Sequence, residues 1–340
     1  MTAPPLVRDV MSKNIPLVAG DQSLRKAAEV MLNTRLLGVI TTDVDRRPEY
    51  VLTYRRLVKL VAEGVDLDEQ IVKYAVRKPV TIRETDTIVE VLEAMRRENV
   101  RFMPVVNNRG EVVGVVEPRH IAGIIWDMLS YGVARVEGVL RRTVVLRGDA
   151  TLRTAARAMD DNGVPEIYVR DGQGVLKVLR EWDFLEAVAR GDVDGDRIVD
   201  YAKTTIVKVP RGYDAKAAVE LMEHNNILRL LVEENGKLRV VTLTDMAFEA
   251  LKYLEELGAK TTAFILVKAE PGRESELAAS LLLIPEIKEI YTVAGEYDLL
   301  IRAEAPGLRE LYTMVSEKIR RDPRIKETTT LVGAEVAEKR

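Results

Sequence analysis

The chain has 340 residues, of which 47% are hydrophobic and 31% charged, with a formal net charge of −3 and no cysteine. This length fits two or three domains. The lack of cysteine excludes disulfides, thiolate catalysis and cysteine-based metal sites, and the net charge supplies no overall attraction to nucleic acid. The dense charge allows the ion-pair networks that are typical of proteins from hot habitats.

The N-terminal stretch MTAPPLVRDVMSKN contains no apolar signal core. No stretch of the sequence approaches the roughly 20 apolar residues of a membrane span. We therefore expect a cytoplasmic protein that binds neither a membrane nor nucleic acid directly. Short basic clusters alternate with acidic residues, and one of them, formed by Arg141, Arg142 and Arg147, is predicted to be a solvated face.

Residues 7–255 repeat one pattern four times. Four methionines lie within apolar patterns of helical spacing and recur after 64, 64 and 63 residues: Met31, Met95, Met159 and Met222. A second anchor follows a β-like run in each copy and recurs after 64, 63 and 62 residues: Thr53, Glu117, Arg180 and Thr242. Two independent anchors with nearly the same period indicate a true repeat.

The fourth copy shows the elements of one unit. The pattern predicts a strand, a helix, two further strands and a closing helix over residues 204–209, 215–223, 228–232, 238–241 and 244–256. The Asn235-Gly236 turn favours a hairpin between the second and third strands. A β-α-β-β-α unit of about 60 residues buries too little surface alone, so we expect the copies to pair.

The second copy reads RKPVTIRETDTIVEVLEAMRRENVRFMPVVNNRGEVVGVVEPRHI, which resembles a cystathionine-β-synthase (CBS) domain almost throughout. The resemblance implies an α/β fold in which copy one pairs with copy two, and copy three with copy four. It also implies clefts between the paired copies. The expected domain boundaries are 7–64, 71–128, 135–192 and 197–255.

Members of this family that bind adenine nucleotides often carry a Gly-h-h-Thr/Ser-x-x-Asp motif at the second anchor, where h is apolar. The resemblance implies that the hydroxyl contacts phosphate and the carboxylate holds the ribose hydroxyls. The fourth copy keeps the pair as Thr242 and Asp245, with Arg239 in place of the glycine. The same spacing also caps a helix, so a capping role is the open alternative. By resemblance, the base of the ligand lies near the first strand and the entry to the second: Thr205, Ile206, Ile227 and Leu228.

The other copies depart from the motif. The third keeps Asp183 but has Arg180 in place of the hydroxyl, which predicts either a phosphate clamp or a surface arginine. The first keeps Thr53 but has Arg56 in place of the acid. In the second copy Glu117 would repel phosphate, so no conventional nucleotide site is expected there.

After Lys252 the period ends, and a different pattern follows Gly258, the predicted stop of the closing helix. It predicts the ferredoxin-like order β-α-β-β-α-β, with elements at 261–269, 273–283, 287–294, 297–304, 307–321 and 325–333. Residues 260–336 resemble the effector-binding domain of the leucine-responsive regulator (Lrp/AsnC) family, most clearly in VAGEYDLLIRAEA.

The Lrp/AsnC resemblance implies at least a dimer, formed through the sheet of this domain. It also implies an amino-acid effector site bordered by Gly295, Tyr297 and Asp298. The alternative is a purely structural turn, in which the glycine permits a tight bend and the aspartate bonds turn amides. The helix-turn-helix unit that usually precedes this domain is replaced by CBS copies, which argues against direct DNA binding.

No pattern in the sequence assembles a catalytic site or a metal site. His120 and His224 are expected to be structural or surface residues, and GDVDGDR at 191–197 is expected to be a linker. We therefore predict a non-enzymatic regulatory sensor that requires no cofactor. AMP, ADP, ATP or S-adenosylmethionine is its expected regulatory ligand, and its protein partner is unidentified. The alternatives are a ligand-independent oligomeric scaffold and a transcription-regulatory protein that acts through a DNA-binding partner.

Overall fold

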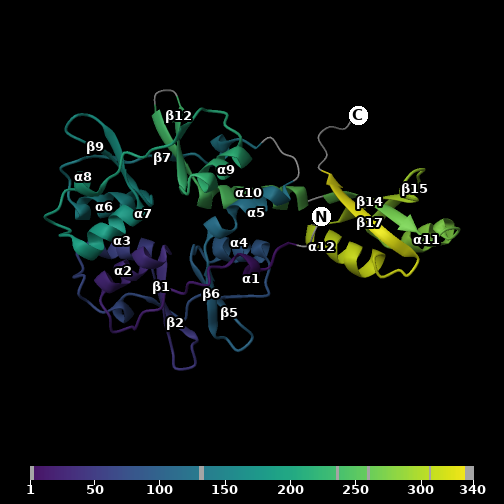
Figure 1. Cartoon of the computed structure of the whole chain (residues 1–340), viewed down its shortest axis with the longest axis horizontal. Coiled ribbons are helices and arrows are strands. Elements are labelled where there is room, and N and C mark those ends of the chain that lie inside the picture. Colours follow the sequence, from purple (N-terminus) through teal and green to yellow (C-terminus); the bar gives the residue numbers. More distant parts are fainter. Residues whose placement is uncertain (1–3, 130–133, 235–236, 259–260, 306–307, 334–340) are drawn as a thin grey trace. The chain divides into compact units, whose positions relative to one another are not determined.

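The computed structural model describes residues 4–129, 134–234, 237–258, 261–305 and 308–333 (Figure 1). The chain divides into two compact units, one of residues 5–249 and one of residues 250–340 together with residues 1–4. The four repeat copies form the first unit, and the tail forms the second. Within the described residues, no helix is long and apolar enough to cross a membrane.

The first two copies follow the expected order of elements. Copy one contains α1 (Val7–Val10), α2 (Leu24–Thr34), β1 (Gly38–Thr42), β2 (Pro48–Thr53) and α3 (Tyr54–Glu63). Copy two begins with η1 (Ile71–Lys73) and β3 (Val76–Arg77), and continues with β4 (Ile82–Arg83), α4 (Ile88–Arg97), β5 (Met103–Val106), β6 (Val112–Val116), η2 (Pro118–His120) and α5 (Ala122–Met128).

The last two copies repeat this order. Copy three contains η3 (Val136–Val139), β7 (Arg141–Arg142), β8 (Val145–Arg147), α6 (Leu152–Asn162), β9 (Ile167–Arg170), β10 (Leu176–Leu179), α7 (Glu181–Arg190) and α8 (Ile198–Tyr201). Copy four contains β11 (Lys208–Val209), α9 (Ala215–His224), β12 (Arg229–Glu234), β13 (Lys237–Thr242) and α10 (Leu243–Gly258). The predicted Asn235-Gly236 turn lies outside the described residues, although β12 and β13 pair in antiparallel register up to Glu234 and Lys237.

Each copy builds a small sheet around a central hairpin. In copies two, three and four a short lead strand pairs in parallel with the first hairpin strand: β4 with β5, β8 with β9, and β11 with β12. In copy one the same position is a single parallel bridge between Leu17 and Ile40. The four repeat methionines are at most 1% exposed, because each lies on the inward face of the helix that covers its own sheet.

The sheets pack within pairs of copies, and the helices pack between the pairs. Copies one and two share an apolar cluster that includes Leu36, Ile40, Phe102 and Val115, and we name this pair module one. Copies three and four share Tyr168, Val178, Leu231 and Val240, and we name this pair module two. Helices α2 and α3 of copy one contact α7 and α6 of copy three, while α5 of copy two contacts α9 of copy four (Figure 1). The predicted pairing of copies is therefore confirmed.

The tail has the predicted β-α-β-β-α-β order. Its elements are β14 (Thr261–Ala269), α11 (Glu274–Leu281), β15 (Ile287–Thr292), β16 (Leu299–Ala305), α12 (Leu308–Thr313), the π-helical turn η4 (Met314–Ile319) and β17 (Ile325–Gly333). The strands form one antiparallel sheet in the order β15-β16-β14-β17. The predicted helix at 307–321 differs in one respect, since its second half is π-helical.

Candidate ligand-binding clefts

The second repeat anchor lies at the start of the closing helix in every copy. Thr53, Glu117 and Arg180 are the N-cap residues of α3, η2 and α7, and Thr242 directly precedes α10. The amide groups and the dipole of a helix N-terminus favour negative charge at such positions. In all four copies, the side chain at the anchor therefore lies where a carboxylate or a ligand phosphate is stabilised.

Thr242 and Asp245 form a complete capping box. The Thr242 hydroxyl donates to Asp245 Oδ2 at 2.8 Å and accepts the Asp245 amide at 3.2 Å. The Thr242 amide donates to the same Oδ2 at 3.3 Å. Both residues are buried, with Thr242 9% and Asp245 6% exposed. The predicted capping role is thus present in this structure, and it leaves only Oδ1 of the carboxylate for another partner.

Asp245 Oδ1 forms an ion pair with Nη2 of Arg141, which lies in β7, the strand before the copy-three lead strand β8. The Arg141 side chain is 53% exposed, whereas that of Asp245 is 5% exposed. Because Arg141 pairs with this buried carboxylate, the prediction that its basic cluster is only a solvated face is wrong for Arg141. A half-exposed guanidinium therefore covers a buried carboxylate.

Arg101 lies near this pair, and Arg55 lies near Arg101. The guanidinium of Arg101 from copy two stacks on the Phe248 ring at 4.2 Å. Partial burial lowers the pKa of Arg101, and the positive charges of Arg141 and Arg55 lower it further, while Asp245 opposes them. Arg141 and Arg101 thus bring positive charge to Asp245, while Glu166 brings a second negative charge to the same neighbourhood.

Cleft two lies beside the Thr242 box. Its lining includes Arg141, Thr143 and Val144 from the start of copy three, Pro165 and Glu166 from the entry to β9, and Thr242. Its enclosed volume of about 10 Å³ is close to the minimum for one water molecule. A nucleoside can enter only if the walls of this cleft separate.

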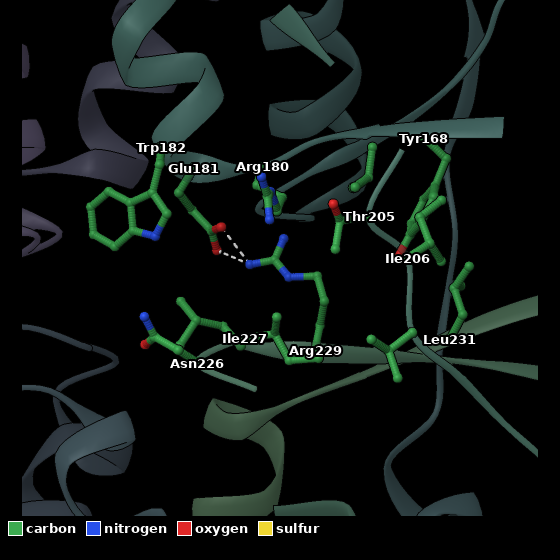
Figure 2. Close-up of a pocket in the computed structure, with 13 residues that line it drawn as sticks. Tyr168, Arg180, Glu181, Trp182, Thr205, Ile206, Asn226, Ile227, Arg229 and Leu231 are labelled. Atoms are coloured by element: carbon green, nitrogen blue, oxygen red, sulfur yellow. Dashed lines mark hydrogen bonds and ion pairs between the residues drawn. The ribbon is translucent and has the colours of Figure 1, made fainter. Parts of the chain in front are cut away.

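Cleft one is larger, at about 50 Å³, and lies on the other side of Tyr168, which lines both clefts. Figure 2 shows Arg180, Glu181 and Arg229 directed toward its centre, with Trp182 at one end and Thr205 and Ile206 along one wall. Arg180 Nε bonds Asp183 Oδ2 at 2.9 Å, and the Arg180 amide donates to the same oxygen at 3.1 Å. An arginine therefore covers the motif carboxylate in this cleft as well.

The two clefts divide the residues that the CBS resemblance groups together. Thr205, Ile206, Ile227 and Leu228 line cleft one together with Arg180, whereas Thr242 lines cleft two. In module two, the residues before the copy-four lead strand β11 thus lie with the copy-three motif, and those before the copy-three lead strand β8 lie with the copy-four motif. The wall that accompanies Thr242 and Asp245 is Thr143 and Val144, and this corrects the predicted grouping.

A buried ion triad joins the linings of the two clefts, because Glu166 lines cleft two while Glu181 and Arg229 line cleft one. Arg229 donates to Glu166 Oε2 at 2.6 Å and to Glu181 Oε1 at 2.5 Å, and the three residues are at most 8% exposed. Burial raises the pKa of the Glu166 carboxyl to about 7, although Arg229 opposes the shift. Burial lowers the pKa of Arg229, but the two carboxylates outweigh it and raise that pKa overall. The triad joins copy three to copy four, and no sequence pattern predicted it.

In module one, the copy-two anchor Glu117 places a carboxylate where copy four has the Thr242 hydroxyl. Glu117 is 2% exposed, accepts the Leu37 amide of copy one at 2.6 Å and accepts Arg119 Nε at 2.6 Å. Burial raises its pKa despite the neighbouring Arg119. His120 accepts the Glu117 amide at 3.2 Å, and burial, followed by the charge of Arg119, lowers its pKa to about 4. A neutral structural histidine therefore supports the buried carboxylate.

Thr53 caps α3 by accepting the Arg56 amide at 3.3 Å, and it lines neither cleft of module two. His224 is an exposed residue in the last turn of α9. In the predicted linker at 191–197, the carboxylate of Asp194 pairs with Arg153 at 2.7 Å and that of Asp192 accepts an amide at 2.9 Å. Among the described residues, no group of three or more His, Cys, Asp or Glu side chains is arranged to hold a metal ion.

Comparison with known families gives a match at each of the four copies. The CBS domain model matches residues 7–63, 71–127, 136–190 and 198–256. The chain belongs to the CBS-domain family. The model described as the Lrp/AsnC ligand binding domain matches residues 262–336 of the tail. This protein therefore joins four CBS domains, which are regulatory modules, to an effector-type domain.

Two of the similar proteins come from Methanocaldococcus jannaschii and one from Pyrococcus furiosus. Uncharacterized protein MJ1404 of Methanocaldococcus jannaschii is 24% identical over 310 residues, which are 85% of this chain and 71% of that protein. The HTH-type transcriptional regulator FL11 of Pyrococcus furiosus is 35% identical over 88 residues, which are 26% of this chain. The chain spans about half (52%) of that regulator. The crystal structure of protein MJ1225 from M. jannaschii has a TM-score of 0.61 at 19% identity, covering 73% of this CBS protein and all but 1% of that chain, which shows a shared fold.

In the Lrp/AsnC-type domain, the predicted effector residues belong to the turn between β15 and β16. Gly295 has a φ of +139°, a backbone conformation that side chains disfavour. Asp298 Oδ2 accepts the Ala269 amide at 2.8 Å, and the Tyr297 hydroxyl lies 2.8 Å from that of Thr329. These bonds match the structural alternative for the turn, because Asp298 fixes the end of β14.

Proposed function

We propose that this CBS protein is a regulatory sensor that binds an adenosyl ligand in cleft two, between copies three and four. Asp245 takes the ribose hydroxyls, and the Thr242 hydroxyl with the first amides of α10 faces the phosphate. The observation that carries the proposal is the buried Thr242–Asp245 pair beside a cleft that Arg141 also lines. Carboxylates accept bonds from two adjacent hydroxyls, and a helix N-terminus favours phosphate.

We extend the proposal to cleft one, as the site of a second adenosyl ligand in the same module. Its wall offers apolar contact to a base through Ile206, Ile227 and Leu231, and Arg180 with Asp183 stands at the motif position. Module one is the weaker candidate, because Glu117 fills its motif position with negative charge. We therefore place the ligand in module two and assign module one a structural role.

Calorimetric titration with AMP, ADP, ATP and S-adenosylmethionine tests the proposal. At least one compound should bind the parent protein, and Asp245→Ala should weaken that binding at least tenfold. Loss of the helix cap costs about 1 kcal/mol, so the variant should stay folded, and its melting temperature verifies this. Asp149→Ala is a matched control, because Asp149 is a 63% exposed surface residue paired with Arg147. If protein free of bound nucleotide binds none of the four compounds, the proposal fails.

We further propose that the Lrp/AsnC-type domain makes the protein at least a dimer. Helices α11 and α12 and turn η4 cover one face of its sheet through Ile265, Val267 and Ile301. The opposite face carries Phe264, Leu331 and Tyr291, which are 37%, 52% and 51% exposed. An apolar sheet face of this kind favours self-association. This domain type also fits an amino-acid effector at the Gly295 turn. It fits a DNA-binding partner or another protein partner as well. We place the protein in the cytoplasm, which suits each of these roles.

A further inference from the structure

In both clefts of module two the motif carboxylate is already bound to an arginine. Arg141 pairs with Asp245 from the opposite copy, and Arg180 pairs with Asp183 from the same helix start. The two arginines occupy different positions of the repeat. In both copies an arginine therefore holds the carboxylate on which the proposed ribose contact depends.

The Arg141 pair blocks the oxygen that a ribose would need. Asp245 Oδ2 already accepts two bonds from Thr242, and Oδ1 is held by Arg141. A ribose with two adjacent hydroxyls must engage Oδ1, so the guanidinium has to leave. Its 53% exposure gives it room to move, whereas the 5% exposed carboxylate is fixed by its helix cap.

A displaced guanidinium needs a new anion. Exchange of a charge-assisted bond for a neutral hydroxyl bond is unfavourable, because bonds between ionised groups are roughly twice as strong as neutral ones. Adenosine offers no anion in return. A nucleotide supplies its phosphate beside Arg141, the arginine that lines the cleft and pairs with Asp245. S-adenosylmethionine brings a positive sulfonium beside the same arginine.

We propose that Arg141 is a phosphate-dependent latch: it holds Asp245 while cleft two is empty, and moves to the phosphate of the ligand when the ribose takes the carboxylate. This inference rests on the proposed function and narrows it to a phosphorylated ligand. The latch makes Arg141 a specificity-determining residue, since its removal strengthens the binding of a neutral nucleoside and weakens the binding of a nucleotide. Arg180 is the corresponding arginine of cleft one.

The test compares AMP with adenosine, which differ only in the phosphate, by calorimetric titration of the full chain. The parent should bind AMP at least tenfold more tightly than adenosine. Arg141→Gln should weaken the binding of AMP at least tenfold, because the phosphate loses its guanidinium partner. The same variant should bind adenosine several-fold more tightly, because the Asp245 carboxylate no longer has to be freed from Arg141. Arg141→Lys keeps the charge without the planar fork, so its AMP-to-adenosine ratio should fall between the other two. Arg147→Gln, at an 87% exposed arginine of β8, is the control and should keep the parent ratio.

The results separate the latch from the proposed function. Equal weakening of both ligands by Arg141→Gln would make Arg141 a structural residue and overturn the latch. An unchanged ratio, or a parent protein that binds adenosine as tightly as AMP, would overturn it too, while still supporting an adenosyl site. No binding of either compound to the parent would overturn both proposals.

Discussion

Arg229 is shared by two buried glutamates, Glu166 and Glu181, so the triad carries one excess negative charge in a position with little water. Each carboxylate accepts a hydrogen bond from Arg229, but one guanidinium charge cannot balance two carboxylate charges. Protonation of one carboxyl relieves this excess. Glu166 is the group that responds, since burial brings its pKa to about 7.

We predict that stability falls as pH rises through the titration of Glu166. The pKa of this carboxyl is about 7 in the folded protein and 4.5 ordinarily, so between these values the folded state holds a proton that the unfolded state has released. The linked contribution is fully present below about pH 4.5 and is lost by about pH 7. Urea unfolding at pH 5 and pH 8 measures it. The decline should be smaller in Glu166→Gln, and an equal decline in both proteins would contradict the assignment.

Sequence reasoning found the motif residues but not their partners. Thr242 and Asp245 could be identified because the hydroxyl and the carboxylate lie in one short segment. Arg141 lies 104 residues before Asp245, and Arg101 belongs to another copy, so no local pattern linked them to the site. The grouping of Thr205 with Thr242 was wrong because the register between paired copies, which decides which strand faces which motif, is invisible within a single copy.

At the scale of elements, one repeat position distinguishes the two modules. Seven residues after each repeat methionine stand Gly38, Phe102, Glu166 and Arg229. In module one, a Cβ at Gly38 would lie 2.8 Å from the Phe102 ring, so the smallest residue accommodates a large one. In module two, Glu166 bonds Arg229 at 2.6 Å. The position complements its partner in size in module one and in charge in module two, which favours the observed pairing of copies.

A double-mutant cycle at Gly38 and Phe102 tests this complementarity. Gly38→Ala should destabilise the protein by about 1–3 kcal/mol through overpacking, and Phe102→Ala by about 3–5 kcal/mol through a cavity. In the double variant the added methyl group enters the cavity, so the two costs should fall short of additivity by at least about 1 kcal/mol. Urea unfolding measures all four proteins.

Gly172→Ala is the control for this cycle, because no atom lies within 4 Å of a Cβ at that position. It should change the unfolding free energy by no more than about 0.5 kcal/mol. Strictly additive costs at Gly38 and Phe102 would show that the two residues do not pack against each other.

The order of elements was predictable because hydrophobic periods and turn residues are local signals. The tail strands 261–269 and 325–333 were predicted with the bounds found for β14 and β17. The lead strand of copy four was predicted at 204–209, but β11 holds only Lys208 and Val209. The residues before β11 line cleft one and do not extend the strand pairing. A β-branched composition is common both in strands and in such an apolar cleft wall, so it could not predict where the strand begins.

At the scale of the whole molecule, Trp182 connects a cleft of module two to both copies of module one. The guanidinium groups of Arg35 and Arg119 lie 5.4 and 5.6 Å from its ring, and Arg119 also holds the buried Glu117. A ligand in cleft one that moved Trp182 would therefore act on module one. Any such coupling requires that the ligand bind two states of the protein with different affinity.

We predict that Phe264→Glu lowers the oligomeric state, because it places a charge in the exposed apolar face of the tail sheet. Light scattering after size-exclusion chromatography should give at least a dimer for the parent and a smaller species for the variant. Leu283→Glu is the matched control, since Leu283 is 83% exposed in the loop after α11 and lies outside the sheet. Dissociation by the control alone would place the interface at that loop.

Hydrogen exchange of the intact protein with and without saturating AMP tests most directly whether the fourth copy holds the ligand. The proposed site predicts slower exchange in residues 141–144, 164–168 and 240–246, which surround cleft two and the Thr242–Asp245 box. The equivalent lead segment of copy one, residues 15–18, should exchange at its original rate. Protection confined to copies one and two, or no protection anywhere at saturating AMP, would contradict the account.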